Sequence, residues 1–239
     1  MGASREQFKV LNDVFDEFTE RNILRLSAQG YFDQIIRSCS LGKEAHIFLA
    51  KTRDNRHVIV KIYRLENCNF NKMYSYIKSD PRYQDIKGKK RQIIFQWVQR
   101  EFRNLHLARE AGVRVPTVHT CMHNILVMEV IGNEHELAPQ LKNVLITEDM
   151  FEDLLNQVRL LYQKAKLVHG DLSKFNVLLD VDKPVIIDMS QTTSVLDPNA
   201  KEYLERDIKN LVSYAKGLGF SYTFEQIYRF IVTPVDFSK

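Results

Sequence analysis

The fold is decided by the stretch HGDLSKFNVLL (residues 169–179) and by the run VIID (residues 185–188) that follows it. Three oxygen-bearing side chains lie at fixed spacings there: Asp171 and Asn176 flank a short loop, and Asp188 ends an apolar run. Hard cations such as Mg²⁺ take oxygen ligands, usually one or two protein groups together with substrate phosphates. Asp and Asn are also common in ordinary turns. The stretch therefore predicts a phosphate-associated metal site only if the rest of the chain supports one.

A lysine in the middle of an apolar strand gives that support. Lys61 lies within the strand predicted over residues 57–63, where neighbouring residues are apolar. A lysine is rarely buried in such a strand without a partner, although an edge strand with a wet outer face would also tolerate it. The helix predicted over residues 92–111 places Glu101 on its apolar face. These two charges predict one buried ion pair, which is better evidence for function than for stability.

The remaining pattern predicts an α+β chain. Strands are expected at residues 35–40, 45–52, 57–63, 118–121 and 125–128, and helices at 8–18, 23–30, 92–111, from Thr147 to about 162, 199–216 and 223–232. Thr147 is the predicted N-cap of its helix, with Glu148 and Asp149 in the first turn.

The order of these elements predicts three parts. Residues 1–34 are an N-terminal helical segment, residues 35–131 an N-lobe of sheet and helix, and residues 132–239 a helical C-lobe that carries the opening stretch. The polar segment at about 65–90 lacks clear periodicity, and we expect it to be a flexible insertion in the N-lobe.

Composition excludes several classes. The contents of 44% hydrophobic and 27% charged residues are typical of a soluble globular protein. The sequence contains neither an apolar run long enough for a membrane span nor a signal-peptide core, so we expect no membrane association. Cys39, Cys68 and Cys121 are too few and too far apart for a disulfide framework or a zinc site. A reducing cytoplasm is the expected setting.

Together these residues suit phosphoryl transfer. Lys61 would hold the α- and β-phosphates of a nucleotide, and Glu101 would hold Lys61. Asp171 would orient or deprotonate the attacking hydroxyl, while Asn176 and Asp188 would hold the metal. The polar turn at residues 40–44, with its single glycine, could direct backbone N–H groups at phosphates, although a plain hairpin turn has the same pattern.

The chain resembles the RIO-type atypical serine/threonine protein kinases, and most closely the first of the RIO subfamilies. The resemblance extends over nearly the whole sequence. It is carried by SLGKEA (40–45), VKIYR (60–64), REFRNL (100–105), MEVIG (128–132), HGDLSKFN (169–176) and IDMSQ (187–191).

The resemblance implies a bilobal protein-kinase-like fold with an N-terminal helical extension and a truncated C-terminal lobe. The chain after Asp188 is short and has no Ala-Pro-Glu element, and Gly170 stands where ordinary kinases have arginine. The turn with Ser40, Gly42 and Lys43 replaces a glycine-rich loop.

The resemblance also extends the predicted nucleotide site. It implies that backbone groups of Glu129 and Ile131 bind adenine and that Ser173 approaches the phosphates. Lys61, Asn176 and Asp188 complete that site, and the catalytic residues are Asp171, Lys61, Glu101 and Asp188.

By the same resemblance, the implied cofactors are ATP and Mg²⁺ or Mn²⁺. The implied activity is phosphoryl transfer to serine or threonine of a protein, including the chain itself, or ATP hydrolysis as a switch in small ribosomal subunit maturation, with a phospho-aspartate at Asp188. The implied partners are a protein substrate and the pre-ribosomal small subunit with its RNA. We expect a cytoplasmic monomer.

Two other classes stay open. Small-molecule phosphotransferases of the aminoglycoside type share a His-Gly-Asp loop, an Asn and an Ile-Asp run, but they build the acceptor pocket from a long helical C-terminal part. An assembly factor that binds nucleotide without turnover is disfavoured because Lys61, Asp171, Asn176 and Asp188 are all present.

Overall fold

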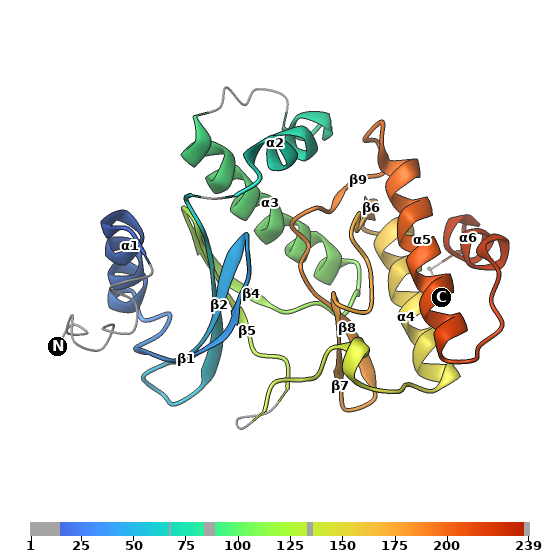
Figure 1. Cartoon of the computed structure of the whole chain (residues 1–239), viewed down its shortest axis with the longest axis horizontal. Helices are drawn as coiled ribbons and strands as arrows, with labels where there is room; N and C mark the ends of the chain where they lie inside the picture. Colours follow the sequence, from blue (N-terminus) through green and yellow to red (C-terminus); the bar gives the residue numbers. More distant parts are fainter. Residues whose placement is uncertain (1–14, 67, 84–88, 133–135, 237–239) are drawn as a thin grey trace.

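The computed structural model describes residues 15–66, 68–83, 89–132 and 136–236. A sheet with the helices α1 (Glu17–Ala28), α2 (Phe70–Ser79) and α3 (Lys90–Glu110) forms the first half of the chain, and helices with short strand pairs form the second (Figure 1). This is the α+β arrangement that the sequence predicts. The division at residues 34 and 131 stays a prediction.

A five-stranded antiparallel sheet has the strand order β1-β2-β3-β5-β4. Its strands are β1 (Gln34–Leu41), β2 (Ala45–Lys51), β3 (His57–Tyr63), β4 (Val118–Met122) and β5 (Ile125–Glu129). Lys61 of β3 is paired with Ile47 of β2 on one side and with Leu126 of β5 on the other. Because β3 is central, Lys61 does not lie on a wet edge strand.

The two faces of β3 pack against different helices. Val60 and Ile62 belong to one buried cluster with Ile23 of helix α1 (Glu17–Ala28), whereas Tyr63 belongs to another cluster with Trp97 of helix α3 (Lys90–Glu110). The alternation follows from the two-residue period of a strand. It directs Lys61 toward α3, which lies on the opposite side of the sheet from α1 in Figure 1.

The N-terminal helices differ from the prediction. The sequence predicts one helix over residues 8–18 and a second ending at Gly30. From residue 15 onward, where the structure describes this segment, it has one helix, α1, which begins at Glu17. Asp16 caps it, since its carboxylate accepts a hydrogen bond from the Thr19 N–H at 2.8 Å. Because an N-cap residue lies outside the helix that follows it, Asp16 ends any continuous helix through the predicted range 8–18. Residues 8–14 lie outside the described residues.

The described residues of the second half, 136–236, form three α-helices and two strand pairs. The helices are α4 (Glu148–Gln163), α5 (Ala200–Gly217) and α6 (Phe224–Val232), preceded by a 3₁₀ turn, η2 (Leu141–Asn143). Strand β6 (Leu167–Val168) pairs with β9 (Thr193–Ser194), and β7 (Val177–Asp180) pairs with β8 (Lys183–Ile186). Strand β6 ends immediately before the loop at residues 169–176, and the β7–β8 hairpin follows that loop.

None of the helices in the described part of the chain has the length and apolar character that a membrane crossing requires.

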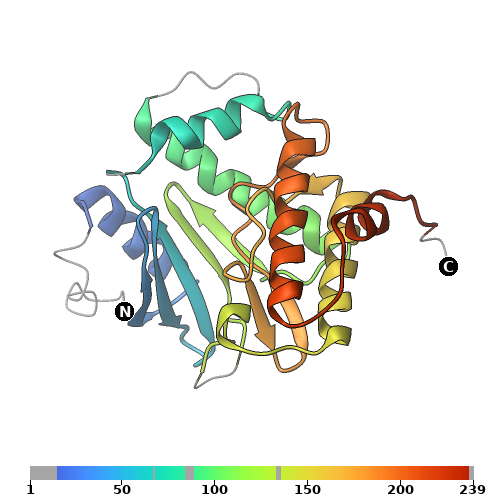
Figure 2. The same ribbon diagram turned by 45° about the vertical axis from the view of Figure 1, so that its right-hand side comes forward.

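The segment expected to be a flexible insertion contains helix α2 (Phe70–Ser79), in which Met73, Tyr76 and Ile77 are buried. Tyr76 stacks on Tyr203 of α5, with ring centroids 5.1 Å apart, and packs edge-on against Trp97 of α3. Figure 2 shows α2 lying over α3 and reaching toward α5. Residues 70–79 therefore form a helix whose buried side chains gain apolar contacts from distant helices. The flexibility of the segment stays a prediction. Residues 67 and 84–88 lie outside the described residues.

Candidate nucleotide and phosphoryl-transfer site

The Lys61 ammonium is at the centre of the candidate site. Its Nζ lies 2.7 Å from Glu101 Oε1 and 3.0 Å from Asp188 Oδ1, and the lysine side chain is 8% exposed. The predicted Lys61–Glu101 pair is therefore present. Tyr63, which the sequence analysis did not select, donates its hydroxyl hydrogen bond to Glu101 Oε2 at 2.5 Å. It lies on the same face of β3 as Lys61, and this shared face was the available signal.

The charges of this cluster keep the lysine protonated. Burial lowers the pKa of Lys61, but the carboxylates of Asp188 and Glu101 outweigh it and hold that pKa well above its usual range. Burial raises the pKa of Asp188, yet Lys61 and the hydroxyl of Ser190, 2.8 Å away, lower it to about 2. An ammonium between two carboxylates leaves a compact charged cluster beside α3.

Asp188 has an unusual backbone conformation. It follows β8 with a φ of +60°, a region that non-glycine residues adopt infrequently but that Asp tolerates. Its side chain is 40% exposed, in contrast to the buried Lys61 and Glu101. Such conformations are concentrated at functional sites, where the surrounding contacts maintain them. The carboxylate is thus fixed by Lys61 on one side and accessible on the other.

Asp171 lies in the loop between β6 and β7 and is half-buried. Its Oδ2 accepts hydrogen bonds from Gln191 Nε2 at 3.0 Å and from Asn176 Nδ2 at 3.3 Å. Asn176 Nδ2 also donates to the Asp171 carbonyl at 2.8 Å. Burial raises the pKa of Asp171, and the nearby charge of Asp188 raises it further. The loop therefore holds a carboxylate of increased basicity.

His169 connects this loop to the approach to Asp188. Its Nδ1 accepts from the Asp171 N–H at 3.2 Å, and its Nε2 lies 3.1 Å from the Ile187 carbonyl. Because a carbonyl only accepts, Nε2 carries the proton, and the neutral tautomer satisfies both contacts. The side chain is 1% exposed. His169 therefore keeps Asp171 and Asp188 in fixed relation.

Asp207 of α5 holds the same loop through hydrogen bonds to its backbone. Its two carboxylate oxygens accept hydrogen bonds from the N–H groups of Gly170 and Leu172, each at 2.8 Å. Burial raises the pKa of Asp207 to about 6, although His169 and the two N–H groups act to lower it. The sequence analysis missed this residue. The available signal was an aspartate beside Leu204 and Ile208, the buried residues of its helix.

Three predicted phosphate contacts lie at the end of β1 and in the turn to β2. Ser40 is an exposed residue of β1, paired with Ile47 of β2. In the turn, Lys43 is exposed and the Gly42 N–H donates to the Ala45 carbonyl at 3.1 Å. A Cβ at Gly42 would lie only 2.8 Å from that carbonyl oxygen, so glycine is required for this tight turn. The next residue, Glu44, is within electrostatic range of Asp188, Lys61 and Asp171, which places the turn beside the site.

The predicted adenine contacts follow β5. The Glu129 N–H donates to the Thr117 carbonyl at 2.8 Å, and the Glu129 carboxylate accepts from the Thr117 N–H at 2.8 Å. The Ile131 carbonyl accepts from the Ala138 N–H at 2.9 Å. The Glu129 carboxylate thus holds Thr117, which precedes β4, so its side chain is engaged within the protein.

Ser173 is used within its own loop. Its hydroxyl accepts from the Phe175 N–H at 3.4 Å, and its carbonyl accepts from the Asn176 N–H at 2.9 Å. These contacts close a tight turn between Asp171 and Asn176. The structure shows the Ser173 hydroxyl in this turn and half-buried, so its predicted approach to phosphates would require the hydroxyl to serve two contacts.

The residues predicted to bind a metal offer suitable donors. Asn176 uses its Nδ2 as a donor to Asp171, which leaves its Oδ1 as the acceptor end. Asp188 Oδ1 accepts from Lys61 and Ser190, whereas no hydrogen bond reaches its Oδ2 within the described part of the chain. An amide oxygen and a carboxylate oxygen fit a hard cation such as Mg²⁺ or Mn²⁺ that also binds phosphate oxygens.

The chain is similar to known proteins over most of its length. Residues 46–227 match the family model described as the RIO domain. The chain is 37% identical to the RIO-type serine/threonine-protein kinase Rio1 of Haloferax volcanii, over 95% of this chain and 78% of that protein. It is 35% identical to the Rio1 protein of Methanocaldococcus jannaschii, over 97% and 81%. Human serine/threonine-protein kinase RIO1 is 30% identical over 94% of this chain and 41% of its own length.

Among solved structures, the fold is similar to that of the Rio2 kinase of Chaetomium thermophilum in a complex with ADP, Mg²⁺ and phosphoaspartate. The TM-score is 0.67 with 21% identity, and the match covers 89% of this chain and 66% of that one. This similarity confirms the kinase-like fold. The match over most of the sequence shows more: the chain belongs to the RIO family of atypical serine/threonine protein kinases.

Proposed function

We propose that this chain transfers the γ-phosphoryl group of ATP to a serine or threonine hydroxyl of a protein, itself included. The observation that carries the proposal is the position of Lys61, whose ammonium is buried between Glu101 at 2.7 Å and Asp188 at 3.0 Å. A fixed positive charge of this kind, next to a half-exposed carboxylate, suits a triphosphate that binds together with a cation.

The nucleotide would bind between the turn and the loop. Backbone groups of Glu129 and Ile131 would contact adenine, and the turn carrying Ser40, Gly42 and Lys43 would cover the phosphates. Lys61 would hold the α- and β-phosphates, with Glu101 fixing its ammonium. Ser173 would approach the γ-phosphate only through the face of its hydroxyl that the Phe175 N–H leaves open.

Asn176 and Asp188 would hold Mg²⁺ or Mn²⁺, which supplies positive charge to the phosphate oxygens. Asp171 would orient the acceptor hydroxyl and take its proton. The hydroxyl oxygen forms a bond to the γ-phosphorus, and the bond from that phosphorus to the β,γ-bridging oxygen breaks. ADP then leaves with the released electron pair. Burial, which raises the pKa of Asp171, increases its capacity as a base.

We also propose ATP hydrolysis through a phospho-aspartate at Asp188. This route is supported by the half-exposed carboxylate, which its pKa of about 2 keeps ionised at neutral pH. A carboxylate oxygen would attack the γ-phosphorus and release ADP. Water would then cleave the acyl phosphate and restore the carboxylate with release of inorganic phosphate. The phosphoaspartate in the Rio2 complex is of the same chemical kind.

For the cellular role, we propose a switch in the maturation of the small ribosomal subunit, with the pre-ribosomal particle and its RNA as partners and a cytoplasmic monomer as the working form. This part rests on the family resemblance.

The test is incubation with γ-labelled ATP and Mg²⁺, alone and with small-subunit precursors, for the wild type and for Asp171→Ala and Asp188→Ala. Acid-stable phosphoserine or phosphothreonine that Asp171→Ala abolishes would support protein phosphorylation. Hydroxylamine-labile label that Asp188→Ala abolishes would support the aspartyl route. Label on an aminoglycoside but on no protein would support the small-molecule phosphotransferase class instead. ATP binding without any turnover would support an assembly factor, and absence of ATP binding would contradict both proposals.

A further inference from the structure

Gln191 has no role in the mechanism proposed above, yet it contacts the catalytic loop directly. It lies three positions after Asp188 in the chain, and the residue is 9% exposed. Its Nε2 donates a hydrogen bond to Asp171 Oδ2 at 3.0 Å. Because an ionised carboxylate only accepts, the donor end of the amide must face Asp171. This places an oriented polar group on the residue proposed to receive the substrate proton.

The contact determines which oxygen of Asp171 remains available. Gln191 and Asn176 both donate to Oδ2, at 3.0 and 3.3 Å. No hydrogen bond to Oδ1 is formed among the residues that the structure describes. Two donors on one oxygen fix the carboxylate plane and leave Oδ1 for an acceptor hydroxyl. Without these donors the Asp171 carboxylate could rotate, because the terminal torsion of an aspartate side chain takes a broad range of values.

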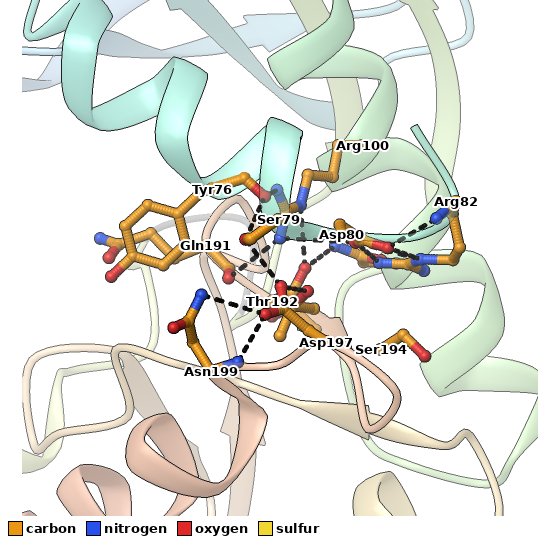
Figure 3. Close-up of polar contacts among 12 residues, drawn as sticks. Tyr76, Ser79, Asp80, Arg82, Arg100, Gln191, Thr192, Ser194, Asp197 and Asn199 are labelled. Carbon is orange, nitrogen blue, oxygen red and sulfur yellow. Dashed lines mark hydrogen bonds and ion pairs between the residues drawn. The ribbon is translucent and has the colours of Figure 1, made fainter. Parts of the chain in front are cut away.

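The backbone of Gln191 is fixed by helix α3. Arg100 donates from Nη2 to the Gln191 carbonyl at 3.5 Å and from Nε to the Thr192 carbonyl at 3.0 Å. Asn104 Nδ2 donates to the carbonyls of Met189 and Thr192 at 3.0 and 2.8 Å. Figure 3 shows Arg100 beside Gln191 and Thr192, with Asp80, which follows α2, 3.5 Å from its guanidinium. Arg100 and Asn104 are both 0% exposed.

These contacts connect the two halves of the site. Arg100 immediately precedes Glu101, the partner of Lys61, so one turn of α3 holds both the phosphate-binding lysine and the backbone of Gln191. Gly170 allows the close approach on the other side, because a Cβ there would lie 3.2 Å from the Gln191 carbonyl oxygen. A chain of buried contacts thus runs from Glu101 through Arg100 and Gln191 to Asp171.

We infer that Gln191 is a positioning residue for phosphoryl transfer, which orients Asp171 so that Oδ1 faces the acceptor hydroxyl. The inference rests on the proposed function. Packing alone does not explain why a glutamine is buried at this position. Fixing a glutamine side chain costs more rotamer entropy than fixing an apolar side chain such as leucine. The specific contribution of the amide is its hydrogen bond to Asp171.

The test compares the wild type with Gln191→Met, which keeps the length of the side chain and removes the donor, and with Gln191→Glu, which places a second carboxylate there. We expect kcat for protein phosphorylation to fall about tenfold in Gln191→Met, the factor of one hydrogen bond to a charged group. KM for ATP is expected to stay unchanged, because Gln191 contacts none of the proposed nucleotide-binding groups. Gln191→Glu is expected to be at least as slow.

Gln163→Met is the matched control. Its Nε2 donates to the carbonyls of Ile231 and Thr233, at the end of α6, at 2.7 and 2.6 Å. These contacts involve no group of the catalytic loop, so Gln163→Met should lower the melting temperature and leave kcat unchanged. Equal kcat in Gln191→Met and the wild type would overturn the inference. So would parallel changes of kcat, KM for ATP and melting temperature, which indicate general loss of structure. An inactive wild type would instead contradict the proposed function.

Discussion

Lys61 Nζ and Glu101 Oε1 lie 2.7 Å apart, although forty positions separate the two residues in the chain. The sheet and helix α3 bring them together, and both side chains are nearly excluded from water. A buried charge pair is costly to disrupt, because removal of one partner leaves the other uncompensated. The site and the packing between sheet and helix therefore depend on the same contact.

We expect Glu101→Gln to lower kcat/KM for ATP by about tenfold to a hundredfold, because Lys61 loses the group that fixes its ammonium. The free energy of unfolding should fall by about 3 kcal/mol or less, since Asp188 still pairs with Lys61 at 3.0 Å. Steady-state kinetics and urea unfolding measure the two effects. Glu110→Gln, an exposed change on the same helix, should alter neither. Full activity in Glu101→Gln would contradict this role.

Gly170→Ala should reduce phosphoryl transfer more than stability alone explains. Gly170 has a φ of +78°, and a Cβ would press on the Gln191 carbonyl oxygen at 3.2 Å. The left-handed conformation costs about 1–2 kcal/mol for alanine. Gly219 has a φ of +86° with nothing within 4 Å of a Cβ, so Gly219→Ala carries the same backbone cost without the contact. We expect similar melting temperatures for the two variants and a lower kcat only for Gly170→Ala. Equal kcat values would indicate that Gln191 tolerates displacement.

Thr147→Ala should destabilise the protein by about 1 kcal/mol without a change in kcat. The Thr147 hydroxyl accepts from the Met150 N–H at 3.3 Å and caps α4, whose first turn carries Glu148 and Asp149. Urea unfolding measures the loss, and Thr147→Ser, which keeps the hydroxyl, should recover most of it. An identical loss in both variants would show that the methyl group rather than the cap matters.

The fold could be predicted where a local pattern carries the information. The alternation in β3 and the apolar face of α3 were enough to pair Lys61 with Glu101, and Thr147 was recognisable as a cap. The packing of helix α2 was not predictable, because Tyr76 packs against Trp97 and Tyr203, which are distant in the sequence. No residue near it in the sequence indicates that packing.

The candidate site likewise combines residues that a local sequence pattern reveals with residues that only the folded structure reveals. Asp171, Asn176 and Asp188 stand in one short stretch, but their supports come from elsewhere. Asp207 reaches the Gly170 N–H across 37 positions, and Asn104 reaches the Met189 carbonyl across 85. An aspartate or asparagine on a helix face normally indicates solvent, so one sequence does not reveal that these two are buried.

Another prediction concerns Asp207 and pH. Its pKa is raised by burial to about 6 from an ordinary value of 3.8, so between these values the folded protein binds a proton that the unfolded chain does not. The contribution of Asp207 to the free energy of unfolding is therefore greatest below about pH 4 and falls as the pH rises through 6. The full change is about 3 kcal/mol for a shift of this size. Asp207→Asn does not titrate, so the difference between wild type and variant in urea unfolding should fall by about that amount between pH 4 and pH 7. If the free energies of unfolding of wild type and variant changed in parallel with pH, this prediction would be contradicted.

Asp207→Asn should also lower kcat at neutral pH. Its amide has one oxygen, which can replace only one of the two carboxylate oxygens that accept from the N–H groups of Gly170 and Leu172, so the catalytic loop is held less firmly.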